Sequence, residues 1–535
     1  MFSKNNSFVR QFLVKRVRIS VLIILLGFLS SCFTLLIPIS VGKYYELVLG
    51  YTSKRLGFIG FIPNAFWNTA DKFLIFFGII IILRFLFYFC YEILLRNESE
   101  RFIKEIKDYL FSNQLKITLD TYKKKGTGRY LLRYTGDINS LKNWYRKGTI
   151  SILIDFILLG IGVYALFRID NLGGIVVLSL IVAGYVLIKI INFKLEKASL
   201  KKRDQTSVQV AYVNRILSGI ITIKSFNRSE IEIKRYKSKS SKILAKSKIY
   251  NKWFLLNSAF IYLLQYSTLL AVLAIFYRSS ADNNFNASAL ISFILLYKTL
   301  FPAIRRIYKL ESVLKFGKIS ERKLINILEQ EQDDSSGVDL KLNNPRLEII
   351  DLKFHNHTSK INFISKKKQL CYLELNDVGM VLPLIETLLR LNKNYSGQIL
   401  INKSNISEVK PSHLRSAISV CTSKFPLVGK TVYEAIVEER SRNIKNDVKA
   451  LFSFFKTRLL PKNDALMFDS KIGENGSDLT AIQKEFLCFL RGFTNNIKHS
   501  KFILIDKFQL LAINERIMNI ILPELDKTII FLKYD

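Results

Sequence analysis

The segment Ile150–Ile191 has the sequence ISILIDFILLGIGVYALFRIDNLGGIVVLSLIVAGYVLIKII, which consists of two long apolar runs joined by the polar link Arg168-Ile169-Asp170-Asn171. Each run approaches the roughly 20 residues that an α-helix needs to cross a bilayer. Because the link is so short, the two runs are predicted to be antiparallel neighbours in the membrane. The chain is therefore expected to be a helical, multi-pass membrane protein.

Four further apolar segments accompany this pair, in a chain of 535 residues of which 49% are hydrophobic. Spans three and four, and spans five and six, have short connections. About fifty residues with helical periodicity separate spans two and three, and again spans four and five. The six predicted spans are Ile19–Val41, Phe73–Leu95, Ile150–Phe167, Leu172–Ile191, Phe254–Tyr277 and Ala287–Pro302.

The chain is strongly basic, with 80 Lys and Arg against 43 Asp and Glu, a formal net charge of +37. The positive charge is dense in the long segments 96–148 and 192–252. The positive-inside rule places these two hairpins and both termini in the cytoplasm of a protein of the plasma or inner membrane. The bilayer is thus an expected partner. Nucleic acid is not, because no basic cluster accompanies a recognisable nucleic-acid-binding motif.

Charged residues inside the spans have two possible interpretations, because they are costly in lipid. Arg84 lies in the middle of span two, while Glu92 and Asp155 lie nearer the cytoplasmic ends. They could line a polar cavity or contact a substrate, or they could form ion pairs within the protein. The five cysteines are scattered without a C-x-x-C pair, so neither a disulfide framework nor a metal site is expected.

The last part of the chain has soluble character. A charged, amphipathic helix is predicted from Glu311, and Asp333-Asp334-Ser335-Ser336-Gly337 has the composition of a linker. Short apolar strands then alternate with helices, which indicates an α/β domain. The predicted organisation is a membrane domain with two long cytoplasmic hairpins at 1–310, a helical linker at 311–337 and an α/β domain at 338–535.

This order of elements resembles a half-size ATP-binding cassette (ABC) exporter of the type I class, and the resemblance covers nearly the whole chain. Leu217–Phe226 is similar to a stretch of that family's second hairpin, and Thr431–Ile436 to a helix of its nucleotide-binding domain. The resemblance implies six transmembrane helices followed by an α/β nucleotide-binding-like domain. It also implies coupling hairpins that reach this domain, marked here by Gly136-Asp137 and by Gly219.

The family's phosphate loop, G-x-x-x-x-G-K-[ST], belongs between an apolar strand and a helix, and it would fall on residues 375–383 here. Gly379 is the one glycine left, Val381 stands at the lysine position, and Leu382 and Pro383 replace the hydroxyl pair that would touch Mg²⁺. One lysine at 381 would not rebuild the loop, since several backbone N–H groups must converge on phosphate. Leu375, Val378 and Met380 complete the altered loop.

The family's other nucleotide motifs are also changed. The signature L-S-G-G-Q is Leu479-Thr480-Ala481-Ile482-Gln483 in this chain. Asp506 survives as a magnesium-side carboxylate, but Lys507 stands where a glutamate orients the attacking water. By the same resemblance, Thr422 occupies the glutamine position of the Q-loop and Tyr534 the position of the switch histidine.

These losses predict a pseudo-ATPase without an ATP or Mg²⁺ cofactor. We expect an ABC-exporter-like integral membrane subunit that acts as a structural, adaptor or regulatory part of a membrane complex. The alternative is one half of a heteromeric exporter of a lipid, peptide or hydrophobic compound, driven by an ATPase-competent partner. In either case the resemblance implies a homodimer or a heterodimer with another half-transporter, to which further subunits could bind.

Overall fold

The computed structural model describes the chain except residues 1–5, 50–68, 126–129, 131–132, 282–286, 340–344, 356, 438–441, 495–499, 509–510, 522–526 and 535. It divides into two compact units. The first, called the membrane unit below, comprises Met1–Leu115 and Lys125–Gln330. The second, called the C-terminal unit, comprises Lys116–Lys124 and Glu331–Asp535.

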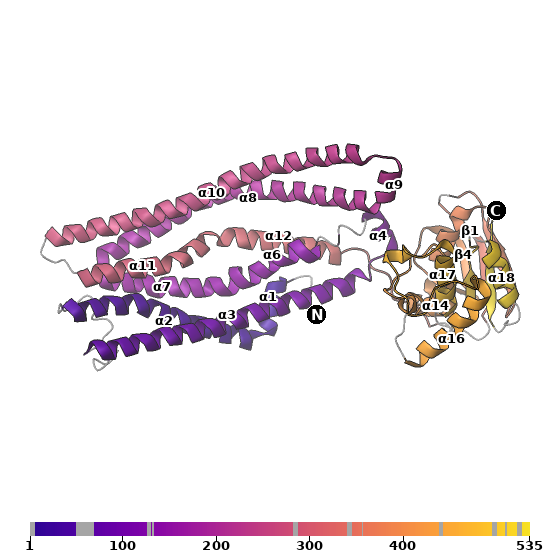
Figure 1. Ribbon diagram of the computed structural model, residues 1–535, viewed down its shortest axis with the longest axis horizontal. Coiled ribbons are helices and arrows are strands. Elements are labelled where there is room, and N and C mark those ends of the chain that lie inside the picture. The colour runs from indigo at the N-terminus through magenta and orange to yellow at the C-terminus, as the bar shows by residue number, and fades with distance from the viewer. Residues whose placement is uncertain are drawn as a thin grey trace. The chain divides into compact units, whose positions relative to one another are not determined.

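The membrane unit is a bundle of long helices, of which six are long and apolar enough to cross a bilayer (Figure 1). They contain all six predicted spans, so the predicted membrane architecture is confirmed. A short helix, α1 (Phe8–Lys15), precedes them. The spanning helices are α2 (Val17–Leu49), α3 (Ala70–Gln114), α7 (Ser151–Ile169), α8 (Asn171–Ser218), α10 (Ser229–Ala281) and α11 (Ala287–Tyr308).

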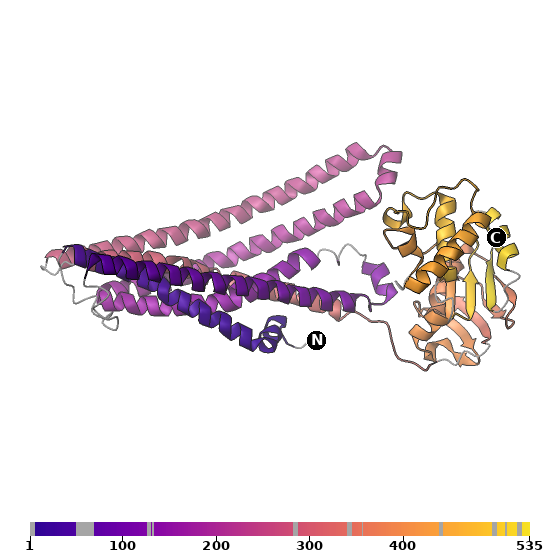
Figure 2. The same cartoon turned by 60° about the horizontal axis from the view of Figure 1, so that its bottom comes forward.

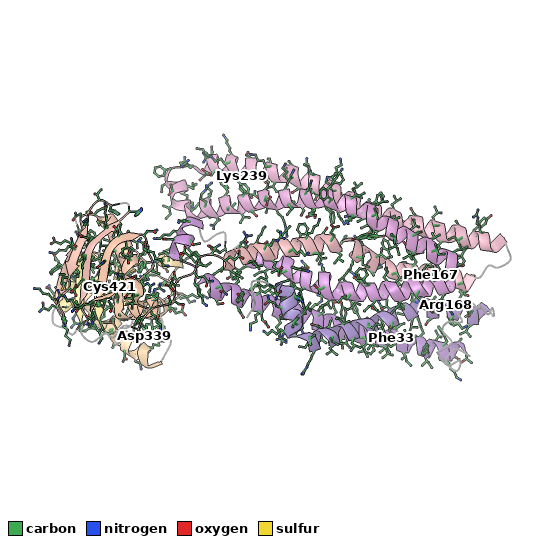
Figure 3. All side chains as sticks on the ribbon, turned by 180° about the vertical axis from the view of Figure 1, so that it is seen from behind. Phe33, Phe167, Arg168, Lys239, Asp339 and Cys421 are labelled. Atoms are coloured by element: carbon green, nitrogen blue, oxygen red, sulfur yellow. The ribbon has the colours of Figure 1, made fainter. Side chains whose placement is uncertain are left out.

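The helices α8 and α10 continue far beyond their apolar parts and lie against each other along most of their length. The short helix α9 (Ile220–Ser225) joins them, and Gly219 caps the end of α8 before it. Figure 3 shows Lys239, from this basic hairpin, at the opposite end of the bundle from Phe167 and Arg168, which lie at the tight turn between α7 and α8. The long basic connection and the short connection therefore lie at opposite ends of the membrane unit.

Two of the three charged span residues considered in the sequence analysis form ion pairs. Asp155 of α7 binds Arg306 of α11 through two contacts, of 2.8 Å from Nε and 2.5 Å from Nη2. Glu92 accepts a bond of 2.8 Å from Arg96, one helical turn away. Of the two interpretations left open by the sequence, the internal ion pair therefore applies to Glu92 and Asp155, whereas Arg84 contacts no carboxylate among the described residues.

The C-terminal unit contains two four-stranded sheets, shown from a second side in Figure 2. One is antiparallel, with the order β2-β1-β4-β5, and the other is parallel, with the order β3-β8-β7-β6. The first contains β1 (Leu347–Phe354), β2 (Ile361–Ile364), β4 (Tyr395–Ile401) and β5 (Ser404–Asn405). The second contains β3 (Leu370–Glu374), β6 (Ile418–Cys421), β7 (Phe502–Ile505) and β8 (Thr528–Lys533).

Helices pack onto these sheets and complete the α/β architecture expected from the alternating pattern. The core on one side of the parallel sheet includes α13 (Val381–Leu388) and α14 (Pro411–Ala417). The other core includes α15 (Val432–Ile436), α16 (Arg442–Leu459), α17 (Ala481–Thr494) and α18 (Leu511–Ile521). Both cores consist of buried aliphatic and aromatic side chains, whose burial is the main favourable contribution to folding.

A short segment of the first long hairpin, Lys116–Lys124, belongs to the C-terminal unit. Its helix α4 (Leu119–Lys125) is held there by an ion pair of 2.6 Å between Lys123 Nζ and Glu386 Oε1. The backbone N–H of Thr118 also donates to the carbonyl of Glu331 at 3.0 Å. The Glu386 side chain is buried, whereas the Lys123 side chain is 49% exposed.

Gly136 and Asp137, which the resemblance marks in the first coupling hairpin, belong to the membrane unit. Those residues lie in the π-helical turn Arg133–Asp137 of the membrane unit, where Asp137 is buried against Arg133 at 2.6 Å. The hydroxyl of Ser320, on α12 (Leu310–Leu328), donates to the same carboxylate at 3.1 Å. Within the predicted linker 311–337, α12 belongs to the membrane unit, and the residues from Glu331 onward belong to the C-terminal unit.

Candidate functional site

The parallel sheet of the C-terminal unit brings the sequence-predicted site residues together. The strands β3, β6, β7 and β8 end at Glu374, Cys421, Ile505 and Lys533. The residues that directly follow these ends are Leu375, Thr422, Asp506 and Tyr534. Carboxyl ends of parallel strands lie at one edge of a sheet, which is where ligands bind in α/β folds. Four positions separated by up to 159 residues of sequence, 375 to 534, therefore share one edge.

The Asp506 carboxylate is the centre of a closed polar cluster at this edge. Thr422 Oγ1 donates to Asp506 Oδ2 at 2.7 Å, and the Tyr534 hydroxyl donates to Asp506 Oδ1 at 2.9 Å. Asp506 itself is 1% exposed. Both donors stand at positions where the resemblance predicts other polar residues, and both bind the retained Asp506.

A lysine that the sequence analysis did not single out completes the cluster. Lys424 Nζ lies 3.8 Å from Asp506 Oδ2 and 5.4 Å from the centre of the Tyr534 ring. The Nζ atom is buried and makes no hydrogen bond to the described residues, although the side chain as a whole is 26% exposed. The Lys424 ammonium group thus lies beside Asp506, the carboxylate that would face a magnesium ion in the family that this sequence resembles.

Lys507 also contacts Tyr534 in this cluster. Lys507 Nζ donates to the Tyr534 carbonyl at 3.1 Å, so the residue at the glutamate position is used to hold the chain end of β8. Burial, and secondly the charge of Asp506, raise the pKa of Tyr534 well above its usual value. The hydroxyl therefore keeps its proton, and its two acceptors are Asp506 Oδ1 at 2.9 Å and the Lys507 carbonyl at 3.0 Å.

In the altered phosphate loop, polar groups are likewise bound by other residues of the protein. After β3, the Asp377 side chain caps the short 3-10 helix Val378–Met380 by accepting the Gly379 N–H at 2.9 Å. The other oxygen of Asp377 lies 3.3 Å from His357 Nδ1. In a phosphate loop, backbone N–H groups at this point are free to bind an anion. Here a carboxylate of the protein already binds one of them.

The residues that follow enter the core. Met380 and Val381 are both 0% exposed and pack in the cluster between the two sheets. Leu382 and Pro383 are half-buried in the first turn of α13, and Val378 is exposed. The position of the missing lysine is therefore an interior position, and not a side chain directed at a ligand.

The altered signature also ends in a helix cap. Thr480 Oγ1 accepts the N–H of Gln483 at 3.2 Å, and Gln483 Oε1 accepts the N–H of Thr480 at 3.0 Å. This reciprocal pair is a capping box at the start of α17. Gln483 Nε2 in addition donates to both carboxylate oxygens of Asp464 at 3.1 Å. Leu479 is half-buried and packs against the core of α15 and α17.

Sequence reasoning identified the edge but missed four residues that act there: His357, Asp377, Lys424 and Asp464. Two local signals were available. Asp377-Val378-Gly379 is a sequence in which an aspartate can cap the N–H two residues later, and Thr480-x-x-Gln483 has the spacing of a capping box. His357 and Lys424 have no such signal, because only the folded sheet brings them to their partners.

Comparison with known proteins agrees with the fold. Residues 20–304 match the family model of the ABC transporter transmembrane region. A Staphylococcus aureus protein (strain bovine RF122 / ET3-1), provisionally named a multidrug export ATP-binding/permease protein, is 22% identical over 409 residues, 74% of this chain and 70% of its own. Its counterpart in strain NCTC 8325 / PS 47 has the same identity and coverage.

Among solved structures, one described as a bacterial Atm1-family ABC exporter with ATP bound superimposes with a TM-score of 0.74. The match covers 98% of this chain and 91% of that one, at 16% sequence identity, and it shows a shared fold. The six membrane helices, the α/β unit and the family match lead to one conclusion: the chain belongs to the ABC transporter family and has the type I exporter fold.

Proposed function

We propose that this protein is an ABC-exporter-like membrane subunit whose ATPase domain is non-functional, and that it acts as a structural, adaptor or regulatory part of a membrane complex. One observation carries the proposal: the groups at the nucleotide-site positions are bound to each other. Asp506 accepts hydrogen bonds from Thr422 and Tyr534 and lies beside the Lys424 ammonium group, and Asp377 binds the N–H of Gly379. A nucleotide would have to break these contacts without gaining a glycine-rich loop.

The way in which two subunits of this family share each ATP site supports a role outside ATP hydrolysis. In that family each ATP lies between the phosphate loop of one subunit and the signature of the other. This chain has lost both elements, at Val381 and at Leu479–Gln483, so it would impair both sites of any dimer. A competent partner would therefore not restore a complete site.

The alternative is one half of a heteromeric exporter, and two observations favour it. The Staphylococcus aureus relatives are named for multidrug export. Helix α4 is also still bound to the C-terminal unit through Lys123 and Glu386, as a transmitting contact would be. Purification from the native membrane distinguishes the two functions, because only the alternative requires a co-purifying subunit with an intact phosphate loop.

A dimer is the expected assembly in either case. At the tip of the α8–α10 hairpin, Ile221 and Phe226 are 79% and 73% exposed. Apolar side chains this exposed at the end of a long hairpin favour a contact with a second chain. The partner could be a second copy or another half-transporter.

The proposed orientation places both termini and the basic hairpins in the cytoplasm. We expect cysteines introduced as Gly136→Cys and Gly219→Cys to react with a membrane-impermeant maleimide only when the reagent has access to the cytoplasmic side of the membrane. Both sites suit the experiment, because a Cβ at Gly136 meets no atom within 4 Å and one at Gly219 meets none closer than 3.6 Å. Labelling at either position in intact cells would show that the hairpins lie on the external side of the membrane.

The proposed loss of nucleotide binding is tested by thermal unfolding of the purified chain with Mg-ATP. A ligand at a hundred times its dissociation constant stabilises a protein by about 2.7 kcal/mol. We expect no such stabilisation at millimolar Mg-ATP, whereas an exporter with an intact phosphate loop should show it in the same assay. A saturable rise in melting temperature that disappears in Asp506→Asn would overturn the proposal.

A further inference from the structure

The parallel sheet of the C-terminal unit has an uncovered edge at β3. In the order β3-β8-β7-β6, this strand has a hydrogen-bonded neighbour on one side only. The Leu375 N–H, directly after the strand, donates to the Lys533 carbonyl at 2.8 Å, so the odd-numbered residues direct their backbone groups at β8. Backbone groups of successive strand residues point in opposite directions. The N–H and carbonyl groups that point away from β8 are those of Leu370, Tyr372 and Glu374.

These outward-facing groups have no backbone partner in the part of the chain that the structure describes. A strand edge of this kind presents a row of unpaired N–H and carbonyl groups with which a further strand can pair. Many proteins protect such an edge with a proline or a β-bulge. The sequence of β3, Leu-Cys-Tyr-Leu-Glu, has no proline, and its register with β8 is continuous. The edge of β3 is therefore open to pairing.

The side chains on one face of β3 are exposed as well. Tyr372 is 42% exposed, whereas Phe531, its direct neighbour in β8, is 7% exposed. The two rings lie 6.4 Å apart, and Lys533 Nζ lies 4.3 Å from the centre of the Tyr372 ring. Glu374, on the same face, is exposed and forms no ion pair with the described residues. An aromatic side chain and a carboxylate thus border the open backbone groups.

The charges along this edge are arranged in one direction. Residues 366–377 have the sequence KKKQLCYLELND, with three lysines before the strand and with Glu374 and Asp377 at its end and after it. Two copies of this segment that run in the same direction would bring lysines close to lysines. In opposite directions, with Tyr372 at the centre, the lysines of each copy approach the carboxylates of the other. Because opposite charges across a strand pair are favourable and like charges are not, the edge is complementary to itself in the antiparallel direction.

We infer that β3 pairs with β3 of a second copy of the chain, antiparallel and with the twofold axis at Tyr372. The three outward-facing residues then exchange backbone hydrogen bonds with the same residues of the second copy, and the two parallel sheets continue into each other. Tyr372 of one copy lies directly opposite Tyr372 of the other, as an aromatic cross-strand pair. A twofold contact of this kind uses the same surface of both copies. This inference goes beyond the proposed function and rests on the sheet edge alone.

The experiment measures the rate of disulfide formation in proteoliposomes of the full chain that carries the change Tyr372→Cys. Residues that exchange both backbone hydrogen bonds in an antiparallel pair have Cα atoms about 5.5 Å apart. This separation lies within the range of about 4.4–6.8 Å that a disulfide bridges. Cys32 and Cys90, the native cysteines that are not buried, are first replaced by alanine. On oxidation with copper phenanthroline we expect Tyr372→Cys to form a covalent dimer, which is measured on a non-reducing gel.

Ile350→Cys in the same background is the matched control. Ile350 lies in β1 and is 43% exposed, almost as much as Tyr372, but β1 has a neighbouring strand on both sides. A thiol at this position meets a second copy only by collision. Tyr372→Cys should therefore crosslink at least about tenfold faster, because strand pairing holds the two thiols at a high effective concentration. Both changes replace an exposed side chain, and the melting temperature of each variant shows whether the fold is retained.

Charge reversal tests the direction of the pairing. Glu374→Lys, combined with Tyr372→Cys, should slow crosslinking by about threefold to tenfold, because it places like charges in contact at both ends of the strand pair. Lys367→Glu, combined with Tyr372→Cys, should slow it for the same reason. The variant with both reversals exchanges the two charges, and its crosslinking rate should return to that of Tyr372→Cys alone.

Three results would overturn the inference. Equal crosslinking rates for Tyr372→Cys and Ile350→Cys would show that β3 is not an interface between copies of the chain. A rate that the single charge reversals leave unchanged, or that the double reversal does not restore, would show that the two strands are not paired in the antiparallel direction. If the same oxidation in native membranes linked Tyr372→Cys to a different chain, the edge of β3 would belong to that partner and not to a second copy.

Discussion

Val381→Lys is expected to destabilise the C-terminal unit by about 3–5 kcal/mol, the range seen when a charge is left uncompensated in a protein interior. Lysine is the residue that a working phosphate loop has at this position. Here, however, the side chain at 381 is 0% exposed and packs among the aliphatic residues of the core between the two sheets. An ammonium group at this position would have no phosphate to bind. The Gly379 N–H, which would be free to bind phosphate in a working loop, is already bound by Asp377.

Val378→Lys is the matched control for this experiment. It makes the same chemical change three positions earlier in the same loop, where the side chain is 45% exposed. A lysine there can extend into solvent, so its effect should stay within about 0.5 kcal/mol. The two variants are compared by urea denaturation of the full chain, monitored by tyrosine and tryptophan fluorescence, and by their melting temperatures.

The outcome decides whether the loop is a damaged binding site or a rebuilt structural element. If Val381→Lys were as stable as the native protein and also gained stability from Mg-ATP, the loop would retain its capacity to bind phosphate. Loss of stability in Val381→Lys alone, with no response to Mg-ATP in either variant, is the expected pattern.

The sequence predicts the fold well because the relevant signals are local. The length of an apolar run shows directly whether it can span a bilayer. The alternation of short and long connections between the spans is also visible in the sequence. The order of strands and helices after Gly337 is also a local pattern. The six membrane helices and the two sheets of the C-terminal unit follow these expectations.

The site is predicted less completely, because its contacts join distant residues. Position by position, the family resemblance identifies Thr422, Asp506 and Tyr534, and the ends of parallel strands bring them together. It does not identify Lys424, which corresponds to no catalytic position and becomes important only through its distance from Asp506.

The first hairpin shows a second limit of sequence reasoning. The family resemblance suggests which hairpin reaches the C-terminal unit but not which residue does. The sequence stretch around Gly136-Asp137 matches the family, yet Asp137 is used to bind Arg133 and Ser320 inside the membrane unit. Lys123 belongs to the C-terminal unit, and its partner Glu386 lies 263 residues later in the chain.

The Asp506 cluster should behave as one energetic unit. Asp506→Asn would leave the ammonium of Lys424 buried without its counter-charge, and Lys424→Met would leave the carboxylate of Asp506 with only two neutral donors. Each single change is expected to destabilise the C-terminal unit by about 3–5 kcal/mol, because removing one member of a buried ion pair strands the other.

The double variant Asp506→Asn/Lys424→Met removes both charges together. It should be more stable than the sum of the single changes predicts, with a coupling energy of about 1–3 kcal/mol between the two positions. Lys507→Met serves as the matched control: it removes the neighbouring ammonium, which binds the Tyr534 carbonyl and not Asp506, and should cost about 1 kcal/mol. All four variants are compared by urea denaturation.

Magnesium gives the experiment a second readout. If Lys424 supplies the positive charge that a divalent cation would supply in an active relative, millimolar Mg²⁺ should leave the stability of the native protein unchanged. Lys424→Met exposes the same carboxylate to a small cation and should recover part of its lost stability in Mg²⁺, whereas the double variant should not. Additive single effects, or a native protein that Mg²⁺ stabilises as strongly as Lys424→Met, would show that Lys424 and Asp506 do not form a pair and that the carboxylate remains available to a metal ion.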